Sequence, residues 1–481
     1  MDTPQSPDML LSLACIISDS VNTIHAACEE TGLAFPKLED AFDLHSEAFR
    51  PHEGVSEATK RIVAAAHQLI AAVLPPATAV YTIAASGIRA YHKAACLRIC
   101  LEENVAEILR EAGPKGLHVS LISQRTNINP NKLARILRFM ATLHIFKELS
   151  PDVFTNNRLS SAFDTGKPVD ELLSNRAARF SGTNGFTALA CLHLDDIFKG
   201  SAYLWETLTD PLTSESVDAK GSACSRALGY ETNIWEFMER PEQAHRLRRF
   251  GEAMRGVQAM EPTDAVLEAC DWKALPEDSV VVDVGGGVGA SVFPLAKYHP
   301  HLRLIVQDRQ DVVEQAKEVW LSKDPAALGM GRVTLQGHDF FESQPVRNAS
   351  VFLLKQVIHD WSDKDAVRIL SGLREASQPT TKLVIIDCLI NHACSLAQLG
   401  EHSSIPGAIP REAPLPLLAN YGAANVMSYF HDITMLTRFN SQERTVAEFS
   451  SLLKMAGWRL VRVRRTDGAD TFLQPLEAVP A

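Results

Sequence analysis

A carboxylate stands two residues before a glycine-rich turn in the segment Ser279-Val-Val-Val-Asp-Val-Gly-Gly-Gly-Val-Gly289. Four of the five residues from Val280 to Val284 are apolar, which predicts a strand buried on both faces, as strands are in a parallel sheet. The glycines let the backbone turn tightly and approach a ligand. The pattern of the next segment, Ser291 to Tyr298, predicts a helix whose N-terminus points at that ligand. This combination predicts a site for a nucleotide-like cofactor.

Asp283 helps to choose among such cofactors. A dinucleotide places its pyrophosphate on the glycines, and a carboxylate two residues before Gly285 would repel it. S-adenosylmethionine (SAM) carries an ammonium and a sulfonium instead, which a carboxylate attracts. The spacing also fits Gly-x-Gly-x-Gly, since residue 290 is alanine. We therefore expect SAM at Asp283, Gly285 and Gly287, and the alternatives are a nicotinamide or flavin cofactor and a purely structural turn.

Two further acids follow predicted strands. Asp308 closes the strand from Leu302 to Gln307, about 20 residues beyond the glycines, where a carboxylate can accept both ribose hydroxyls. Its alternative role is a helix N-cap. Asp339 follows the next strand and is placed to accept the adenine amino group, with Phe340 against the ring.

His359 is the sharpest candidate for a catalytic base. It follows the strand from Val351 to Leu354 and precedes a helix that Ser362 caps, so it lies in a loop at the ligand-binding edge of the predicted sheet. With an unperturbed pKa near 6.5, a neutral imidazole is available to take a proton from an acidic hydroxyl. A structural hydrogen-bonding role is the alternative.

Composition limits the class of protein. The 481 residues are 46% hydrophobic and 22% charged, which predicts a soluble globular chain of about two to three domains. The net charge of -11 argues against a general nucleic-acid binder. The apolar run from Met9 to Ile17 lacks the basic start of a signal peptide, and Pro75-Pro76 interrupts Ile62 to Ala85, so we expect no membrane span and a cytosolic location.

Nine scattered cysteines form no disulfide framework and fit a reducing compartment. Cys388, His392 and Cys394 offer three ligands in a predicted loop with no matching CxxC, so we expect no metal site.

The elements that carry these residues predict four regions: a helical extension (1–93), a winged-helix-like module (94–165), a helical linker and acceptor-pocket region (166–260) and a catalytic domain (261–470). In the last of these, strands and helices alternate, which predicts an α/β, Rossmann-like, doubly wound parallel sheet with ligands at the carboxyl ends of its strands. The proline-rich stretch 391–425 is a long insertion.

The second region combines a helix with a short ribbon. Apolar residues at 133, 136, 137, 140 and 143 form one helical face, with Asn129 as cap and Pro130 in the first turn, and Ile145–Leu149 and Val153–Thr155 form the wing. Such modules often bind DNA. In an acidic chain with a cofactor domain behind it, we favour dimerisation over DNA contact or plain packing.

Together these motifs resemble the class I SAM-dependent O-methyltransferases of the caffeate and sterigmatocystin type, from about Ala94 to Arg465. The resemblance rests on the glycine signature and on four later motifs, namely Val306-Gln-Asp308, Gly337-His-Asp339, Lys355-Gln-Val-Ile-His-Asp-Trp361 and Gln442-Glu-Arg-Thr445. The winged-helix-like module matches that family's dimerisation domain, so the resemblance implies a homodimer.

The resemblance also implies residue roles. Gly285 and Asp308 would bind SAM, Asp339 and Phe340 would hold the adenine, and Lys355 would lie against the cofactor. His359 would be the base, flanked by Asp387 and Glu443. Asp387 departs from the plant members, which have Glu there. Asp360 and Met435 would contact the acceptor.

The reaction predicted is O-methylation of a phenolic or enolic hydroxyl on a small aromatic or polyketide-like metabolite. Its rivals are a SAM-dependent N- or C-methyltransferase, a catalytically inactive SAM-binding dimer and a nicotinamide oxidoreductase.

Overall fold

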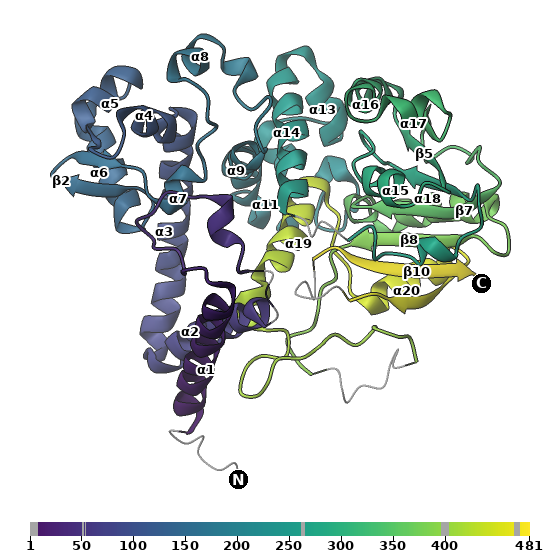
Figure 1. The fold of residues 1–481 in the computed structure, drawn as a ribbon, viewed down its shortest axis with the longest axis horizontal. Coiled ribbons are helices and arrows are strands. Elements are labelled where there is room, and N and C mark those ends of the chain that lie inside the picture. Colours follow the sequence, from purple (N-terminus) through teal and green to yellow (C-terminus); the bar gives the residue numbers. More distant parts are fainter. Residues whose placement is uncertain (1–7, 51, 53, 261–264, 396–403, 466–471) are drawn as a thin grey trace. The chain divides into compact units, whose positions relative to one another are not determined.

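The computed structural model describes residues 8–50, 52, 54–260, 265–395, 404–465 and 472–481 (Figure 1). The chain forms two compact units. The first contains Met1–Ser214 and Ala223–Met260, and the second contains Glu215–Ser222 and Glu261–Ala481. Every candidate site residue named above lies in the second unit.

The second unit is built on a seven-stranded sheet of order β6-β5-β4-β7-β8-β10-β9. Its strands are β4 (Val280–Val284), β5 (Arg303–Asp308), β6 (Val333–Gly337), β7 (Ala349–Lys355), β8 (Lys382–Asp387), β9 (Trp458–Val463) and β10 (Gln474–Pro480). The first five run parallel, and β4 pairs with β5 on one side and with β7 on the other. The strand order therefore reverses at β4, where parallel α/β sheets form a ligand crevice.

Helices cover both faces of this sheet, as the doubly wound prediction requires. They are α15 (Val292–Tyr298), α16 (Gln310–Lys323), α17 (Pro325–Gly329), α18 (Asp363–Ala376) and α20 (Val446–Met455). The unit also contains α19 (Val426–Phe439) and the short turns η4 (Ala219–Gly221), η6 (Trp272–Ala274), η7 (Ile358–Asp360) and η8 (Gly422–Asn425). Leu370 of α18 and Phe449 of α20 belong to one hydrophobic core, and Leu295 of α15 and Trp320 of α16 belong to another. The predicted α/β, Rossmann-like fold is confirmed.

The sheet is not parallel throughout, contrary to the sequence prediction, because its last two strands run antiparallel to each other. β10 pairs antiparallel with both β8 and β9, so two of the seven strands form an antiparallel hairpin. Sequence periodicity missed β10 because it contains Pro475 and the charged Glu477. Glu477 is nonetheless buried, since its carboxylate pairs with Lys382 at 2.8 Å and with Arg464 at 3.3 Å.

Part of the predicted insertion 391–425 lies outside the described residues, which resume at 404. The described part is fastened to the edge strand β9. The Val463 amide donates to the carbonyl of Pro406 at 2.9 Å, and Arg465 Nε donates to the carbonyl of Gly407 at 3.0 Å. A Cβ atom at Gly407 would lie 1.9 Å from the Val463 carbonyl oxygen, so only glycine allows this close approach.

The first unit begins with helices and continues into a three-stranded winged-helix-like module. The helices are α1 (Asp8–Thr31), η1 (Leu44–Glu47), α2 (Val55–Val73) and α3 (Pro76–Glu102); the module contains α4 (Val105–Ala112), β1 (Leu117–His118), α5 (Val119–Arg125), α6 (Pro130–Thr142), β2 (Lys147–Ser150) and β3 (Val153–Thr155). Leu133, Leu137 and Met140 of α6 are buried in the module's core, and Asn129 caps that helix as expected.

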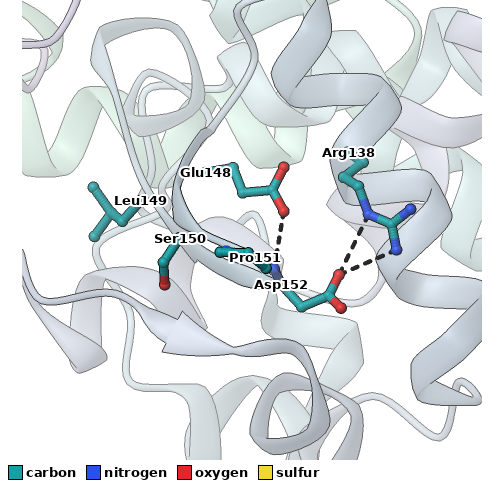
Figure 2. A pocket seen from close by; sticks show the side chains of 6 residues that line it. All are labelled: Arg138, Glu148, Leu149, Ser150, Pro151 and Asp152. Atoms are coloured by element: carbon teal, nitrogen blue, oxygen red, sulfur yellow. Dashed lines mark hydrogen bonds and ion pairs between the residues drawn. The ribbon is translucent and has the colours of Figure 1, made fainter.

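The wing of this module pairs with Arg138, one of the basic side chains of α6 that a DNA-binding interpretation would use. Arg138 donates from Nε and Nη2 to Asp152 Oδ1 at 3.3 and 3.1 Å, while Glu148 accepts from the Asp152 amide at 2.9 Å (Figure 2). An arginine paired with an acid in this way is less available to a phosphate group.

The first unit ends in short helices and one long one. They are α7 (Arg158–Ser161), α8 (Val169–Ser174), η2 (Arg176–Ala178), α9 (Phe186–Leu192), the π-helical η3 (His193–Ile197), α10 (Phe198–Ser201), α11 (Leu204–Thr209), α12 (Ala223–Leu228), α13 (Ile234–Glu239), η5 (Pro241–Gln243) and α14 (Ala244–Met260).

One described helix, Met9–Thr31, is long and apolar enough to cross a membrane, with a mean hydropathy of 1.3. It extends well beyond the apolar run recognised in the sequence, and it packs against α2. By length and composition alone, the same features are found in helices of soluble proteins and in signal sequences.

Candidate active site

The glycine turn leaves β4 with Asp283 directly beneath it. Asp283 is 1% exposed, and neither of its carboxylate oxygens has a hydrogen-bond partner among the described residues. A Cβ atom at Gly286 would lie 2.5 Å from Asp283 Oδ2, so a glycine is needed there. Burial raises the pKa of the Asp283 carboxyl to about 7, although the charge of Lys355 opposes this rise. A buried acid without a partner is the kind of group that a cationic ligand would satisfy.

Gly289 has a second steric role in the same turn. Its φ of +82° suits glycine, and a Cβ atom there would lie 2.6 Å from Trp320 Nε1. The indole instead donates to the Val288 carbonyl at 3.1 Å. Gly285 and Gly287 also adopt positive φ angles, of 68° and 57°.

Asp308 closes β5 beside this turn. Its Oδ2 accepts from the Gly287 amide at 2.8 Å, and its Oδ1 accepts from the Arg309 amide at 2.8 Å. Burial raises the pKa of this carboxyl, while the two backbone donors lower it. The structure therefore brings Asp283, Gly287 and Asp308 to one edge of the sheet, where the sequence predicted a cofactor.

The other predicted cofactor residues lie on the neighbouring strand ends. Asp339 follows β6, and its Oδ1 accepts from the Phe341 amide at 2.9 Å. Phe340 packs edge-to-face on Trp361 with ring centroids 5.7 Å apart, and one of its ring carbons lies 3.6 Å from the place of a Cβ at Gly285. Lys355 ends β7, and its charge acts on Asp283.

His359 lies in η7, immediately after β7, and is 8% exposed. Its Nδ1 lies 2.7 Å from Oε1 of Glu443, 84 residues away in the sequence. An ionised carboxylate only accepts hydrogen bonds, so this contact places a proton on Nδ1. Nε2 lies 3.6 Å from Asp360 Oδ1. Of the predicted flanking acids, Glu443 thus contacts the imidazole directly.

Arg444 holds the loop that carries His359, a role that the sequence did not reveal. Its side chain is 1% exposed and donates to the carbonyl of Ile358 at 3.1 Å and to that of Trp361 at 2.9 Å. Nη2 also donates to Asp363 Oδ1 at 2.7 Å. The arginine therefore ties both ends of η7 to the start of α18.

Helix α19 fixes the position of Glu443 itself. Asp432 of this helix accepts from the Glu443 backbone amide at 2.9 Å. Met435, predicted to line the acceptor pocket, is 8% exposed on the same helix, which packs against η7. An Asp within an apolar helix was the only sequence signal for Asp432.

Asp387 is the second predicted flanking acid. It ends β8, is fully buried, and has no hydrogen-bond partner among the residues that the structure describes. Burial raises the pKa of its carboxyl to about 7, partly offset by the charge on His359. It acts on the imidazole through its charge alone, whereas Glu443 acts through both its charge and a hydrogen bond.

The electrostatics of His359 differ from the sequence-based expectation. Burial alone would lower the pKa of the imidazole. The nearby carboxylates outweigh burial and raise that pKa to about 10; in order of effect, they belong to Glu443, Asp360 and Asp387. The expectation of an unperturbed, neutral imidazole is therefore wrong, because the sequence indicated these three acids but could not show how close their charges lie to the imidazole. Asp360 itself has a pKa raised to about 6, mainly by burial.

The fold and this edge of the sheet define a Rossmann-like methyltransferase architecture, and comparison with known proteins extends this. An O-methyltransferase domain model matches residues 205–404, and an O-methyltransferase dimerisation domain model matches residues 86–166. The chain is 45% identical to 4-O-methyltransferase 1 of Phanerochaete chrysosporium, over 99% of this chain and 100% of that protein. It is 40% identical to an O-methyltransferase of Armillaria gallica, over 96% of each chain.

Among solved structures, the mitomycin 7-O-methyltransferase has a TM-score of 0.62 and 23% identity, over 84% of this chain and 99% of that one. This likeness supports the fold. The protein belongs to the SAM-dependent O-methyltransferase family, and it is an enzyme that takes SAM as co-substrate.

Proposed function

We propose that this enzyme methylates a phenolic or enolic hydroxyl of a small aromatic or polyketide-type secondary metabolite, with His359 as the general base. The observation that carries this proposal is the 2.7 Å contact between His359 Nδ1 and Glu443 Oε1. It fixes the tautomer in which Nε2 is the nitrogen that can accept a proton. The named activities of the relatives support the choice of a hydroxyl.

The residues around the glycine turn fit the co-substrate. When bound, SAM supplies an electrophilic methyl group on a sulfonium sulfur. Asp283 offers a buried carboxylate to its positive charge, and the Asp308 oxygens, each of which accepts one backbone amide, can accept the ribose hydroxyls as well. Phe340 would lie against the adenine, with Asp339 as acceptor for its amino group. Lys355 would lie near the cofactor, where it also balances Asp283.

His359 would accept the hydroxyl proton at Nε2 and leave the acceptor oxygen as the nucleophile. The carboxylates that raise the pKa of His359 stabilise the imidazolium formed by this transfer. Near neutral pH the site without acceptor holds the imidazolium. An acceptor must then either bind already ionised, as its phenolate, or bind as the neutral hydroxyl while the imidazolium releases its proton to solvent. Either route becomes more favourable as pH rises.

Met435 and Asp360 would contact the acceptor, and Glu443 and Asp387 would act as positioning residues. Burial of His359 keeps water from this charge cluster, so its interactions are stronger than at the surface. The dimerisation-domain match supports a homodimer. We expect no metal cofactor in methyl transfer and neither a nucleic-acid nor a membrane partner, and the proposed compartment is the cytosol.

Replacement of His359 by Ala tests the proposal. Turnover with a phenolic acceptor should fall by roughly 100-fold or more, because general-base catalysis is lost, while SAM affinity stays close to that of the native enzyme. Single-turnover assays and titration calorimetry measure the two quantities. His392→Ala, at an exposed histidine, is the matched control and should retain full turnover. Turnover of His359→Ala within tenfold of native would refute the base assignment.

A further inference from the structure

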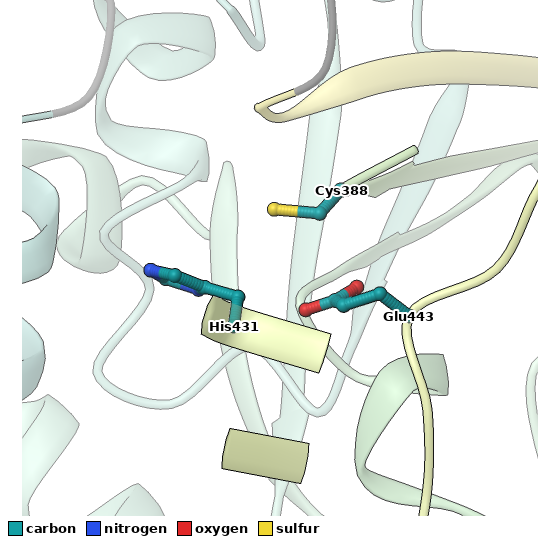
Figure 3. A group of neighbouring side chains, drawn as sticks. All are labelled: Cys388, His431 and Glu443. Carbon is teal, nitrogen blue, oxygen red and sulfur yellow. The ribbon is translucent and has the colours of Figure 1, made fainter. Parts of the chain in front are cut away.

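A thiol, an imidazole and a carboxylate come together next to the proposed base. Cys388 follows the last residue of β8, His431 lies in α19, and Glu443 precedes α20 (Figure 3). One potential ligand atom from each, sulfur, nitrogen and oxygen, lies within 4.8 Å of the other two. Three separate segments of the chain thus converge on one small volume.

The donor set is chemically selective. Thiolate and imidazole together favour borderline and soft transition metals, of which Zn²⁺ is the most common, and disfavour Mg²⁺ and Ca²⁺, which prefer oxygen. Three protein ligands leave the fourth tetrahedral position to water. Cys388 is 1% exposed and His431 is half-buried, so the cluster can be reached from the histidine side.

Glu443 supplies an independent indication of a ligand. Its Oε1 contacts His359, but its Oε2 is buried and has no hydrogen-bond partner among the described residues. A buried carboxylate oxygen without a partner is unfavourable unless a cation or donor satisfies it. A metal held at Oε2 would meet this need without first displacing His359.

We propose that Cys388, His431 and Glu443 form a binding site for a divalent transition metal such as Zn²⁺, and that occupancy of this site slows methyl transfer. The binding part depends on the cluster alone. The inhibitory part rests on the proposed role of Glu443, since a dication on this carboxylate weakens its contact with His359 Nδ1, 2.7 Å away, which orients the proposed base.

This metal site differs from the group of possible ligands in the predicted loop, which combined Cys388 with His392 and Cys394. Cys394 and His392 are both exposed and do not belong to the cluster. They nevertheless provide a matched control, because Cys394 is a second thiol in the same part of the chain.

Binding is tested with Co²⁺, which reports its ligands by absorption. The metal-free enzyme, kept reduced and without acceptor, should take up one Co²⁺ and show a near-ultraviolet thiolate-to-cobalt charge-transfer band. Cys388→Ser should abolish the band, and His431→Ala should weaken affinity by about tenfold or more. Cys394→Ser should keep both the charge-transfer band and the native Co²⁺ affinity. Absence of the band in the native enzyme, or its survival in Cys388→Ser, overturns the site.

Inhibition is tested separately. Zn²⁺ should lower native turnover, EDTA should restore it, and Cys388→Ser should be less sensitive than Cys394→Ser, each compared with its own metal-free rate. If Co²⁺ binds as expected but Zn²⁺ leaves turnover unchanged, the inhibitory part is wrong and the binding site stands. Loss of turnover in His359→Ala is measured without metal, so the proposed function is judged independently.

Discussion

Asp283 carries a buried carboxyl whose pKa lies near 7 in the absence of ligand, because burial disfavours its charge. A cationic co-substrate favours the ionised form, so binding below this pKa requires the release of a proton. SAM affinity should therefore weaken by up to about tenfold per pH unit below pH 7 and level off above it. Titration calorimetry from about pH 5.5 to 8 measures this.

Asp283→Asn provides the control for this dependence. The amide cannot ionise, so the variant should bind SAM more weakly above pH 7 and lose the pH dependence below it. A native affinity that stays constant across this range would show that SAM does not interact with the Asp283 charge.

Glu443 and Asp387 act on His359 in different ways, and substitution should separate them. Glu443→Gln removes a directly hydrogen-bonded carboxylate and should lower kcat by about 10- to 100-fold, whereas Asp387→Asn removes a charge that makes no hydrogen bond and should cost less. Without the Glu443 charge, the pKa of His359 falls, so the rise of residual activity with pH should begin at lower pH. Equal losses of kcat in the two variants, together with a pH profile of Glu443→Gln that matches the native one, would contradict this assignment.

At the scale of elements, η7 depends on Arg444. Arg444→Met keeps most of the side-chain volume but leaves the carbonyls of Ile358 and Trp361 without their donor. We expect a loss of about 2 kcal/mol or more in the free energy of unfolding, and a fall in kcat because η7 carries His359. Thermal or denaturant unfolding and steady-state kinetics measure the two effects.

Arg368→Met, on the exposed face of α18, is the comparison for this prediction. Arg368 pairs with Asp365 and lies over the Phe341 ring at the surface, so its loss should change stability by less than about 1 kcal/mol. A similar small change in Arg444→Met would mean that η7 holds its shape without the arginine.

Sequence patterns predicted the parallel strands well because apolar runs followed by turns are distinctive. They placed β4 with its glycine turn, and they placed His359 in a loop after β7. They could not pair His359 with Glu443, since the 84 intervening residues leave no periodic signal. Glu443 was predicted from family resemblance alone, and Arg444, although part of the same motif, had no predicted role. These patterns also missed β10, whose Glu477 is buried beside Lys382 and Arg464, partners that only the folded sheet brings together.

At the scale of the whole molecule, the chain carries two compact units and a dimerisation-domain match. We expect the enzyme to behave in solution as a homodimer with twice the chain mass of 52.8 kDa. Sedimentation at micromolar concentrations and at several salt concentrations measures this mass. A species of 52.8 kDa throughout would show that the matched domain does not associate in this protein.

The segment at 405–408 that lies against β9 has a consequence for solubility. An edge strand presents unpaired amides and carbonyls on which another chain can add, and this is a common route to aggregation. Here the Pro406 carbonyl occupies the Val463 amide, and the close fit of Gly407 keeps the segment in place. This part of the proline-rich stretch therefore also shields the β9 edge of the sheet from edge-to-edge association.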